Sequence, residues 1–247
     1  MDHRRAVAAI PARWASTRFP GKPLAPILGV PMIAHVVARA LEAGCFAEVL
    51  VATDDDRIAS AARSAGARAV MTGEAASGSD RIAEAVRDIE ADIVINVQGD
   101  EPALPADNLR LLTRFLRERP DAGMATLSLP GNDADLANPN VVKVVCDLAG
   151  RALYFSRAPI PFPRNPVAGL IRRHVGLYGF RRDTLYRFTS LPASPLELAE
   201  GLEQLRALTN GIALYVLEAA ADSIAVDVPD DVPRAATALA ALRQGGR

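Results

Sequence analysis

Short apolar runs alternate with helical patterns through the first third of the chain. Four runs bounded by turn residues predict buried strands, at 6–10, 48–53, 68–71 and 92–97. Apolar residues at helical spacing predict helices between and after them, at about 31–43, 57–64 and 77–89. This alternation favours an α/β fold with a mainly parallel sheet and right-handed crossovers.

The second half of the chain is less regular. Two short strands around the turn at 147–150 predict a β-hairpin, at 141–146 and 152–155. The proline-rich stretch 159–166 is excluded from helices and central strands. Other strands are predicted at 124–129, 175–180 and 213–217, and helices at 106–119, 183–189, 195–210 and 230–242. We therefore expect one domain over residues 1–247, with a hairpin-rich insertion at about 130–180.

Composition excludes several classes of protein. A net charge of −1 gives no bulk electrostatic reason to expect nucleic acid or a membrane as a partner. No apolar stretch approaches a membrane span, and the early run at 6–11 is too short for the core of a signal peptide. Cys45 and Cys146 lie far apart in apolar stretches and predict buried, reduced thiols. These features indicate a cytoplasmic protein.

Lysine is rare in this chain. Lys22 and Lys143 are the only two, and all other basic side chains apart from histidine are arginines. Codon bias is the default explanation, but a compact ammonium differs chemically from a guanidinium. The two lysines are therefore candidates for specific roles.

Polar loops follow strands of the predicted sheet at 11–26, 73–81 and 98–105, where α/β sheets bind ligands. The first contains two arginines, two hydroxyls, a glycine and Lys22. Flexible backbone and fixed cations suit a triphosphate, although the Walker pattern Gly-x-x-x-x-Gly-Lys-Ser/Thr is absent. The alternative is a solvated cationic loop, and the position directly after the first strand favours phosphate binding.

Two carboxylates are candidate magnesium ligands. Asp100 follows a buried strand, and Asp227 ends a strand-like run at 224–226. Magnesium prefers a few carboxylates together with substrate oxygens. Either residue could instead cap a helix. Asp107 is the better cap for the helix at 106–119, which leaves Asp100 without a structural explanation, whereas a cap is favoured for Asp227 taken alone.

The other polar residues carry little information singly. Ser77 or Ser79 before a predicted helix is a capping motif. His174 and Tyr178 share a face of a predicted strand, but such pairs belong more often to core or surface. Glu203 and Gln204 are neighbours in a predicted helix and point in different directions.

Taken in order, the motifs resemble one family, the 3-deoxy-manno-octulosonate (Kdo) cytidylyltransferases, or CMP-Kdo synthetases. The resemblance covers nearly the whole chain. Its most diagnostic motifs are Ile10-Pro-Ala-Arg-x-x-Ser-x-Arg-x-Pro-Gly-Lys-Pro-Leu24 and Asn96-Val-Gln-Gly-Asp-Glu-Pro102. The others are Val51-Ala-Thr-Asp54, Ala76-Ser-Gly-Ser-Asp-Arg81, Ala125-Thr126, Ala152-Leu-Tyr-Phe-Ser-Arg157, Arg173-His-x-Gly-x-Tyr178, Leu202-Glu-Gln-Leu-Arg206 and Val226-Asp227.

The resemblance implies a Rossmann-like nucleotidyltransferase fold, a homodimer built through the insertion, and conversion of CTP and Kdo to CMP-Kdo and pyrophosphate for lipopolysaccharide synthesis. At matching positions the triphosphate would be held by Arg13, Ser16, Arg18 and Lys22, and the cytidine end by Ser77, Gly78 and Arg81. Mg²⁺ would be bound by Asp100 and Asp227. The sugar pocket would be lined by Gln98, Arg157, His174, Tyr178, Glu203 and Gln204.

The reaction implied needs no protein nucleophile, because the anomeric hydroxyl of the sugar attacks the α-phosphorus. Lys22 and Arg18 would offset the charge on the leaving pyrophosphate, and Asp100 would act through the metal. The chain departs from the family at Trp14, usually tyrosine, at Val30, often lysine, and at Ser79-Asp80, often Thr-Glu or Thr-Asp. Alternatives are a cytidylyltransferase for a related acid sugar such as 8-amino-Kdo, and a catalytically inactive regulatory homologue. Sialic acid activation is less favoured, because its enzymes carry a different arginine-rich first loop.

Overall fold

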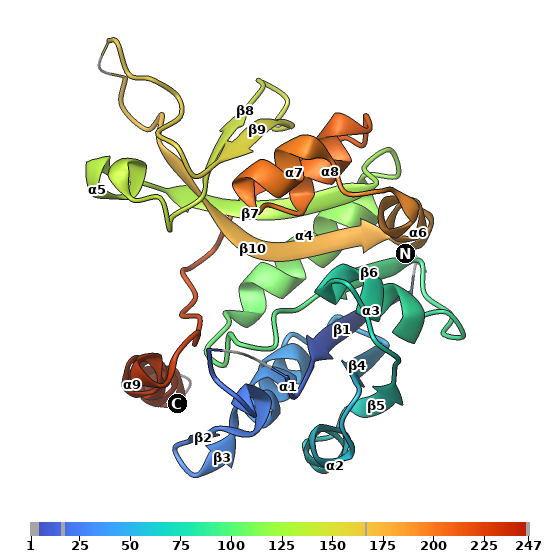
Figure 1. Cartoon of the computed structure of the whole chain (residues 1–247). Coiled ribbons are helices and arrows are strands. Elements are labelled where there is room, and N and C mark those ends of the chain that lie inside the picture. Colours follow the sequence, from blue (N-terminus) through green and yellow to red (C-terminus); the bar gives the residue numbers. More distant parts are fainter. Residues whose placement is uncertain (1–4, 16–17, 166, 246–247) are drawn as a thin grey trace.

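The computed structural model describes residues 5–15, 18–165 and 167–245, and its centre is one mixed sheet (Figure 1). Neighbouring parallel strands form one side, in the order β5 (Arg68–Met71), β4 (Glu48–Thr53), β1 (Ala6–Ala12) and β6 (Ile93–Asn96). The other side continues with β10 (Arg172–Arg181), β7 (Met124–Pro130) and β11 (Leu214–Glu218). Of these strands only β10 runs antiparallel to its neighbours, so the predicted mainly parallel α/β fold is confirmed.

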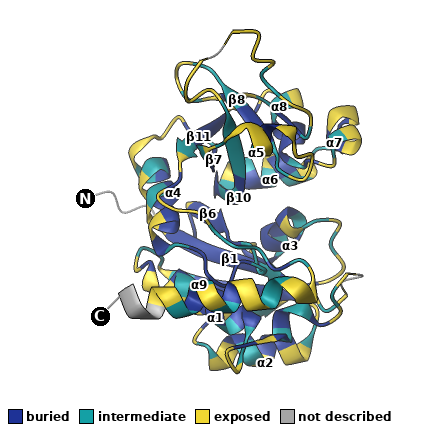
Figure 2. Ribbon diagram, turned by 90° about the vertical axis from the view of Figure 1, so that its left-hand side faces the viewer, coloured by how far each residue is buried: buried dark blue, intermediate teal, exposed yellow. Residues whose placement is uncertain are grey.

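Helices cover both faces of the sheet, because alternate residues of each strand point to opposite sides. Ala6, Ala8 and Ile10 of β1 belong to one core with α1 (Met32–Glu42), α2 (Asp56–Ser64) and α4 (Ala106–Glu118). Val7 and Ala9 belong to a second core with α3 (Gly78–Ala85), α6 (Arg182–Ser190) and α8 (Gln204–Thr209). The central strands are therefore buried on both sides (Figure 2), which explains their near-continuous apolar runs.

The predicted hairpin consists of β8 (Lys143–Cys146) and β9 (Ala152–Ser156). It joins the sheet where Lys143 pairs with Arg173 of β10. Together with α5 (Asp133–Ala137) and α7 (Pro195–Glu200) it forms the end of the molecule farthest from α2 (Figure 1). The pattern did not predict α5, because a helix this short shows no periodicity; its capping box, formed by Asn132 and Asp135, is the local signal.

The chain returns to the first half at its C-terminal end. After the short turn η2 (Pro229–Asp231), α9 (Val232–Gly245) packs beside α1 and the small ribbon β2 (Pro26–Ile27) and β3 (Val30–Pro31). The contact is a small apolar cluster, made by Ile27, Met32, Ala103, Val226, Ala235 and Leu239. Within the residues described, no helix is both long and apolar enough to cross a bilayer.

Several local predictions are wrong. The helix expected at 195–210 is two helices, because Gly201 takes a left-handed backbone (φ 62°) and ends α7. Asp107 does not cap α4: Pro105 occupies the N-cap position and the Asp107 carboxylate accepts from Arg110. Residues 224–226 are irregular rather than a strand. Cys45 and Cys146 are free thiols, as expected, but half-buried rather than buried.

Candidate active site

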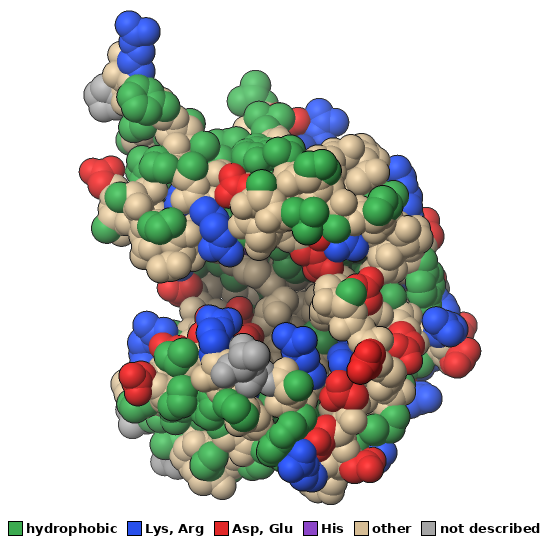
Figure 3. All heavy atoms as spheres, in the orientation of Figure 1, with side chains coloured by type: hydrophobic (Ala, Val, Ile, Leu, Met, Phe, Trp, Pro, Cys, Tyr) green, Lys and Arg blue, Asp and Glu red, His purple; other side chains and the backbone are tan. Residues whose placement is uncertain are grey.

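A cavity of about 310 Å³ opens at the carboxyl ends of β1 and β6. The strand order reverses there, since β4 and β5 lie on one side of β1 and β6 on the other. Such reversal points are where α/β sheets bind ligands. Figure 3 shows the hollow, with basic and acidic side chains along its lower lip. Its lining residues are Pro11, Ala12, Arg13, Arg18, Lys22, Pro23, Ala75, Ala76, Ser77, Gly78, Arg81, Gln98, Gly99, Asp100 and Asp227.

The loop after β6 lies directly against the end of β1. A Cβ at Gly99 would lie 2.8 Å from the carbonyl oxygen of Pro11, so only glycine fits here without a shift of the backbone. The N–H of Val97 donates to the carbonyl of Ala9 at 3.0 Å and continues the pairing of the two strands. This close approach places Asp100 beside the loop that carries Lys22.

Two carboxylates converge on one ammonium. Lys22 Nζ lies 2.7 Å from Asp100 Oδ2 and 3.8 Å from Asp227 Oδ1. Arg18 donates to the same Asp227 oxygen at 3.0 Å. The side chain of Lys22 is only 16% exposed, so this contact is largely shielded from water. The sequence predicted acids and bases in this cavity, and the structure adds that they pair with one another.

Asp227 reaches the cavity through backbone contacts of an irregular segment. The N–H of Val226 donates to the carbonyl of Asp100 at 2.9 Å. The hydroxyl of Ser223 donates to Glu101, whose pKa is raised to about 7, chiefly by burial. Asp231 accepts from the N–H of Asp227 at 2.9 Å, so Asp227 is not itself a cap there.

The residues predicted to contact the cytidine end line the same cavity. Of the two caps predicted, Ser77 or Ser79, the N-cap of α3 is Ser77, which accepts from the N–H of Asp80 at 3.1 Å. Arg81 is buried, and its guanidinium donates to Thr72 at 2.6 Å and to Asp54 at 2.8 Å. The start of α3 thus directs helix N–H groups toward the cavity. Of the predicted triphosphate residues, Ser16 lies outside the described part of the chain.

Only one residue predicted for the sugar pocket lines this cavity. Gln98 does so, and its Nε2 donates to the carbonyl of Gly176 at 2.9 Å. Gly176 lies in a bulge of β10 between Val175 and Tyr178, and bulges often redirect side chains beside active sites. The other residues predicted for the sugar pocket do not line this cavity. They lie on β10, after β9 and around the start of α8, and are Arg157, His174, Tyr178, Glu203 and Gln204.

His174 and Tyr178 are in contact, with ring centroids 5.5 Å apart. His174 Nε2 lies 2.9 Å from the hydroxyl of Thr126, which is also 2.8 Å from the carbonyl of Leu177 and 3.2 Å from that of Val175. Because both carbonyls can only accept, this geometry favours the tautomer in which the Nε2–H of His174 donates to Thr126 and the hydroxyl proton goes to a carbonyl. Nδ1 is then the acceptor of a neutral imidazole.

Desolvation disfavours the charged form of both aromatic groups. Desolvation lowers the pKa of His174 to about 3. Desolvation, and secondarily the Glu203 carboxylate, raise the pKa of Tyr178 well above its ordinary value. The pair therefore offers neutral hydrogen-bonding groups around neutral pH.

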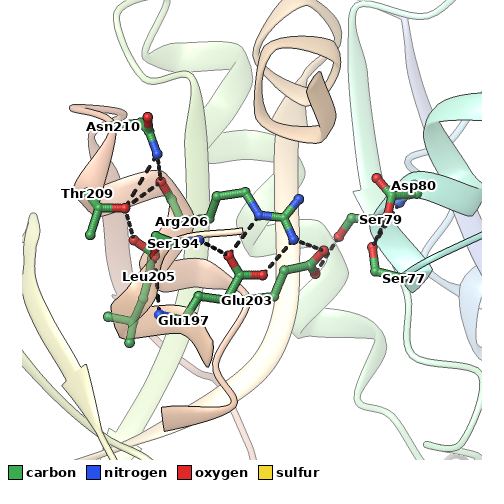
Figure 4. A network of polar contacts seen from close by, with 10 residues as sticks. All are labelled: Ser77, Ser79, Asp80, Ser194, Glu197, Glu203, Leu205, Arg206, Thr209 and Asn210. Carbon is green, nitrogen blue, oxygen red and sulfur yellow. Dashed lines mark hydrogen bonds and ion pairs between the residues drawn. The ribbon is translucent and has the colours of Figure 1, made fainter. Parts of the chain in front are cut away.

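Glu203 connects the two halves of the molecule (Figure 4). The hydroxyl of Ser79, on α3, donates to Glu203 Oε2 at 2.8 Å across 124 residues of sequence. Arg206 lies 3.8 Å from Glu203 Oε1 and binds Glu197 through both oxygens, at 2.6 and 2.9 Å. Glu203 Oε1 is buried and accepts no hydrogen bond within the described residues. Its carboxylate thus has capacity for a further donor.

Sequence reasoning missed the residues that hold these side chains. Thr126 stood in a recognised motif without a role, and Glu197, Glu200 and Arg206 were given none. The available signal was a hydroxyl in the middle of the apolar β7 run, where a buried polar group requires a partner.

Comparisons with known proteins give a consistent result. Residues 7–219 match a protein family described as cytidylyltransferase. The chain is 48% identical to a 3-deoxy-manno-octulosonate cytidylyltransferase of Anaeromyxobacter sp. (strain Fw109-5), over 96% of this chain and 98% of that one. It is 50% identical to the protein of that name from Geobacter sulfurreducens, over 92% and 96%. A solved structure of CMP:2-keto-3-deoxy-manno-octonic acid synthetase complexed with CTP is similar, with a TM-score of 0.92, 44% identity and coverage of 96% and 99%.

Proposed function

The chain belongs to the 3-deoxy-manno-octulosonate cytidylyltransferase family, and we propose that it transfers CMP from CTP to the anomeric hydroxyl of Kdo. The products are CMP-Kdo and pyrophosphate, for lipopolysaccharide synthesis. The observation that carries the proposal is the cavity at β1 and β6, where Lys22 and Arg18 face Asp100 and Asp227. The intact charged set argues against an inactive regulatory homologue.

The chain's own groups act by alignment and charge. Arg13, Ser16, Arg18 and Lys22 bind the triphosphate, and the start of α3 receives the cytidine end through Ser77, Gly78 and Arg81. Lys22 and Arg18 offset the negative charge that builds on the leaving pyrophosphate. Catalysis of phosphoryl-type transfer depends chiefly on such positioning and electrostatic stabilisation.

We assign Mg²⁺ to Asp100 and Asp227. Both carboxylates lie within 3.8 Å of the same Lys22 nitrogen, so they face a common point. No cluster of three or more His, Cys, Asp or Glu side chains suited to a metal occurs in the described ranges. Two carboxylates completed by substrate oxygens are the donor set that magnesium prefers. Bound there, the ion would neutralise phosphate charge.

The sugar acid lies behind the phosphates, toward β10 and α8. We place it among Gln98, Arg157, His174, Tyr178, Glu203 and Gln204. Neutral His174 and Tyr178 suit sugar hydroxyls, and Glu203 Oε1, which accepts no hydrogen bond within the described residues, can accept from another. Gln98, which lines the cavity and contacts β10, joins the two parts of the site.

We propose that the protein is a homodimer formed through its insertion. Exposed apolar side chains lie there in the hairpin turn, in β9 and in the loop after β9: Leu148, Leu153, Phe162 (84% exposed) and Val167. A monomer rarely leaves such a set uncovered. Phe162→Asp should shift the mass in light scattering from dimer to monomer. A wild-type monomer would refute the assignment. The need for CTP supports a cytoplasmic location, which we propose as well.

The reaction is tested by pyrophosphate release with CTP, UTP, ATP and GTP, each against Kdo, 8-amino-Kdo and sialic acid. We expect turnover with CTP and Kdo, confirmed by isolation of CMP-Kdo. Preference for 8-amino-Kdo would replace the sugar assignment. No release with CTP and any of the three sugars would overturn the proposal.

A further inference from the structure

Lys143 is a fully buried charge that the proposed reaction does not use. Its Nζ donates to the backbone carbonyls of Asn138 at 2.9 Å, Val141 at 2.6 Å and Arg157 at 2.6 Å. An ammonium has three N–H donors, and here each has its own acceptor. Burial and the nearby Arg157 lower the pKa of Lys143, against which the carboxylates of Glu200 and Asp135 act.

The three carbonyls come from the two segments that meet at the open end of the hairpin, where Lys143 pairs with Ser156. Asn138 and Val141 precede β8, and Arg157 follows β9. Lys143 therefore ties together the open end of the β8–β9 hairpin. The compact ammonium suits three converging carbonyls, whereas a planar guanidinium is larger and directs its donors differently.

Arg157 is held from the other side by Glu200. The Glu200 carboxylate accepts from the hydroxyl of Ser156 at 2.6 Å and from the N–H of Arg157 at 2.9 Å. The Nε of Arg157 donates to the Glu200 carbonyl at 2.8 Å. Both backbone groups of Arg157 are thus fixed, one by Lys143 and one by Glu200, and its guanidinium is directed by donation to the carbonyls of Glu200 and, at 3.2 Å, of Pro139.

The same end of the hairpin supports His174. The carbonyl of Val142, next to Lys143, accepts the N–H of His174 at 2.8 Å. The ring of Phe155 meets the ring of His174 edge-on, with centroids 5.0 Å apart. Displacement of the hairpin would therefore move two residues assigned to the sugar acid, Arg157 and His174.

We propose that Lys143 is a positioning residue for the sugar acid: its buried ammonium fixes the open end of the hairpin and thereby the place of Arg157 and His174. The inference rests on the proposed function. The inference predicts that a Lys143 variant binds Kdo less well and CTP normally. The three hydrogen bonds of the Lys143 ammonium involve none of the residues that line the nucleotide cavity.

The test is steady-state kinetics of Lys143→Met, which keeps the length of the side chain and removes the donors. We expect the KM for Kdo to rise about 10- to 100-fold, as for a misplacement of about 1 Å, with the KM for CTP unchanged within about twofold. A loss of folded protein would lower kcat and leave both KM values unchanged. An unchanged KM for Kdo in a variant that folds, whether or not kcat falls, would overturn the inference.

Val144→Ala is the matched control, because it removes buried apolar atoms from the same strand and leaves the carbonyl contacts in place. We expect a lower melting temperature with both KM values unchanged. If Lys143→Met does not fold, Glu200→Gln tests the same claim, since it loosens Arg157 from the other side. A selective rise in the KM for Kdo supports the inference, and an unchanged value refutes it. Failure of the wild-type protein to turn over CTP and Kdo would instead refute the proposed function.

Discussion

Lys22 Nζ lies 2.7 Å from Asp100 Oδ2, although 78 residues separate them in sequence. The pair joins the first polar loop to the loop after β6. The two side chains are 16% and 29% exposed, and the cost of removing both charges from water offsets much of their attraction, so such a pair is weak evidence for a role in stability. Both residues line the cavity, as the proposed binding of phosphates and magnesium there requires.

Lys22→Ala should therefore impair the reaction far more than the fold. We expect turnover to fall by about 10²- to 10³-fold, because positive charge is lost where the leaving group gains negative charge. Pyrophosphate release measures the effect, and circular dichroism checks the fold. Arg114→Ala, an exposed arginine of α4 outside the cavity lining, should change neither. Turnover within tenfold of wild type would contradict the role of Lys22.

Asp100→Asn tests the magnesium assignment. The amide keeps the shape of the side chain and removes the charge that a magnesium ion requires. We expect turnover to be lost with an unchanged melting temperature, and wild-type turnover to stop with a chelator and return with Mg²⁺. Asp107→Asn, an exposed carboxylate of α4, is the control and should behave as wild type. Activity that persists in the chelator would show that no metal is needed.

Trp14 is the only tryptophan of the chain and lies in the first polar loop. Its carbonyl accepts the N–H of Gly21 at 3.2 Å, and the Arg57 guanidinium stacks 3.4 Å from the ring centroid. Gly21 precedes Lys22, so the indole reports on the residues that face the triphosphate. Tryptophan fluorescence should change saturably as CTP is added.

Trp14→Phe should abolish that signal. Arg57→Ala should alter the emission of the free protein, because a cation leaves the ring face. A constant emission up to CTP concentrations that saturate turnover would contradict the placement of the triphosphate at this loop.

Ser79 is a position where the chain departs from its family, and its hydroxyl bridges to Glu203. Ser79→Ala should raise the KM for Kdo by about 2- to 10-fold, since one hydrogen bond to a charged group is lost and Glu203 is less well held. Ser79→Thr, which restores the common family residue, retains the hydroxyl and should behave as wild type. Equal kinetics of the alanine and threonine variants would show that the bridge has no part in catalysis.

Local chemistry made much of the fold predictable. The apolar runs of β1, β4 and β6 reflect burial on both faces, and Ser77 was one of two caps predicted from their position before a helix. The break between α7 and α8 was signalled by Gly201. It was missed because apolar residues continue at helical spacing on both sides.

The site was predictable only in part, because its geometry depends on long-range contacts. No periodicity indicates that an irregular segment would place Asp227 beside Asp100; that follows from the packing of α9 and from the Val226 N–H. Similarly, Thr126 acquires its role only once β7 pairs with the bulge of β10. The resemblance to the family drew attention to these residues but gave no information about the contacts that position them.

The lowered pKa of His174 predicts how stability depends on pH. The ordinary pKa of a histidine is 6.5, whereas the pKa of His174 in the folded protein is about 3. Between these two pH values His174 binds a proton in the unfolded chain but not in the folded protein. The free energy of unfolding should therefore fall as the pH drops from about 6.5 to about 3, by at most about 1.4 kcal/mol per pH unit from this group. His174→Gln cannot take up the proton and should remove this part of the dependence. Urea unfolding of both proteins between pH 7 and pH 4 measures the difference, and all other titrating groups cancel in the comparison. Parallel curves for the two proteins would show that His174 titrates alike in both states, and its neutral role in the site would have to be abandoned.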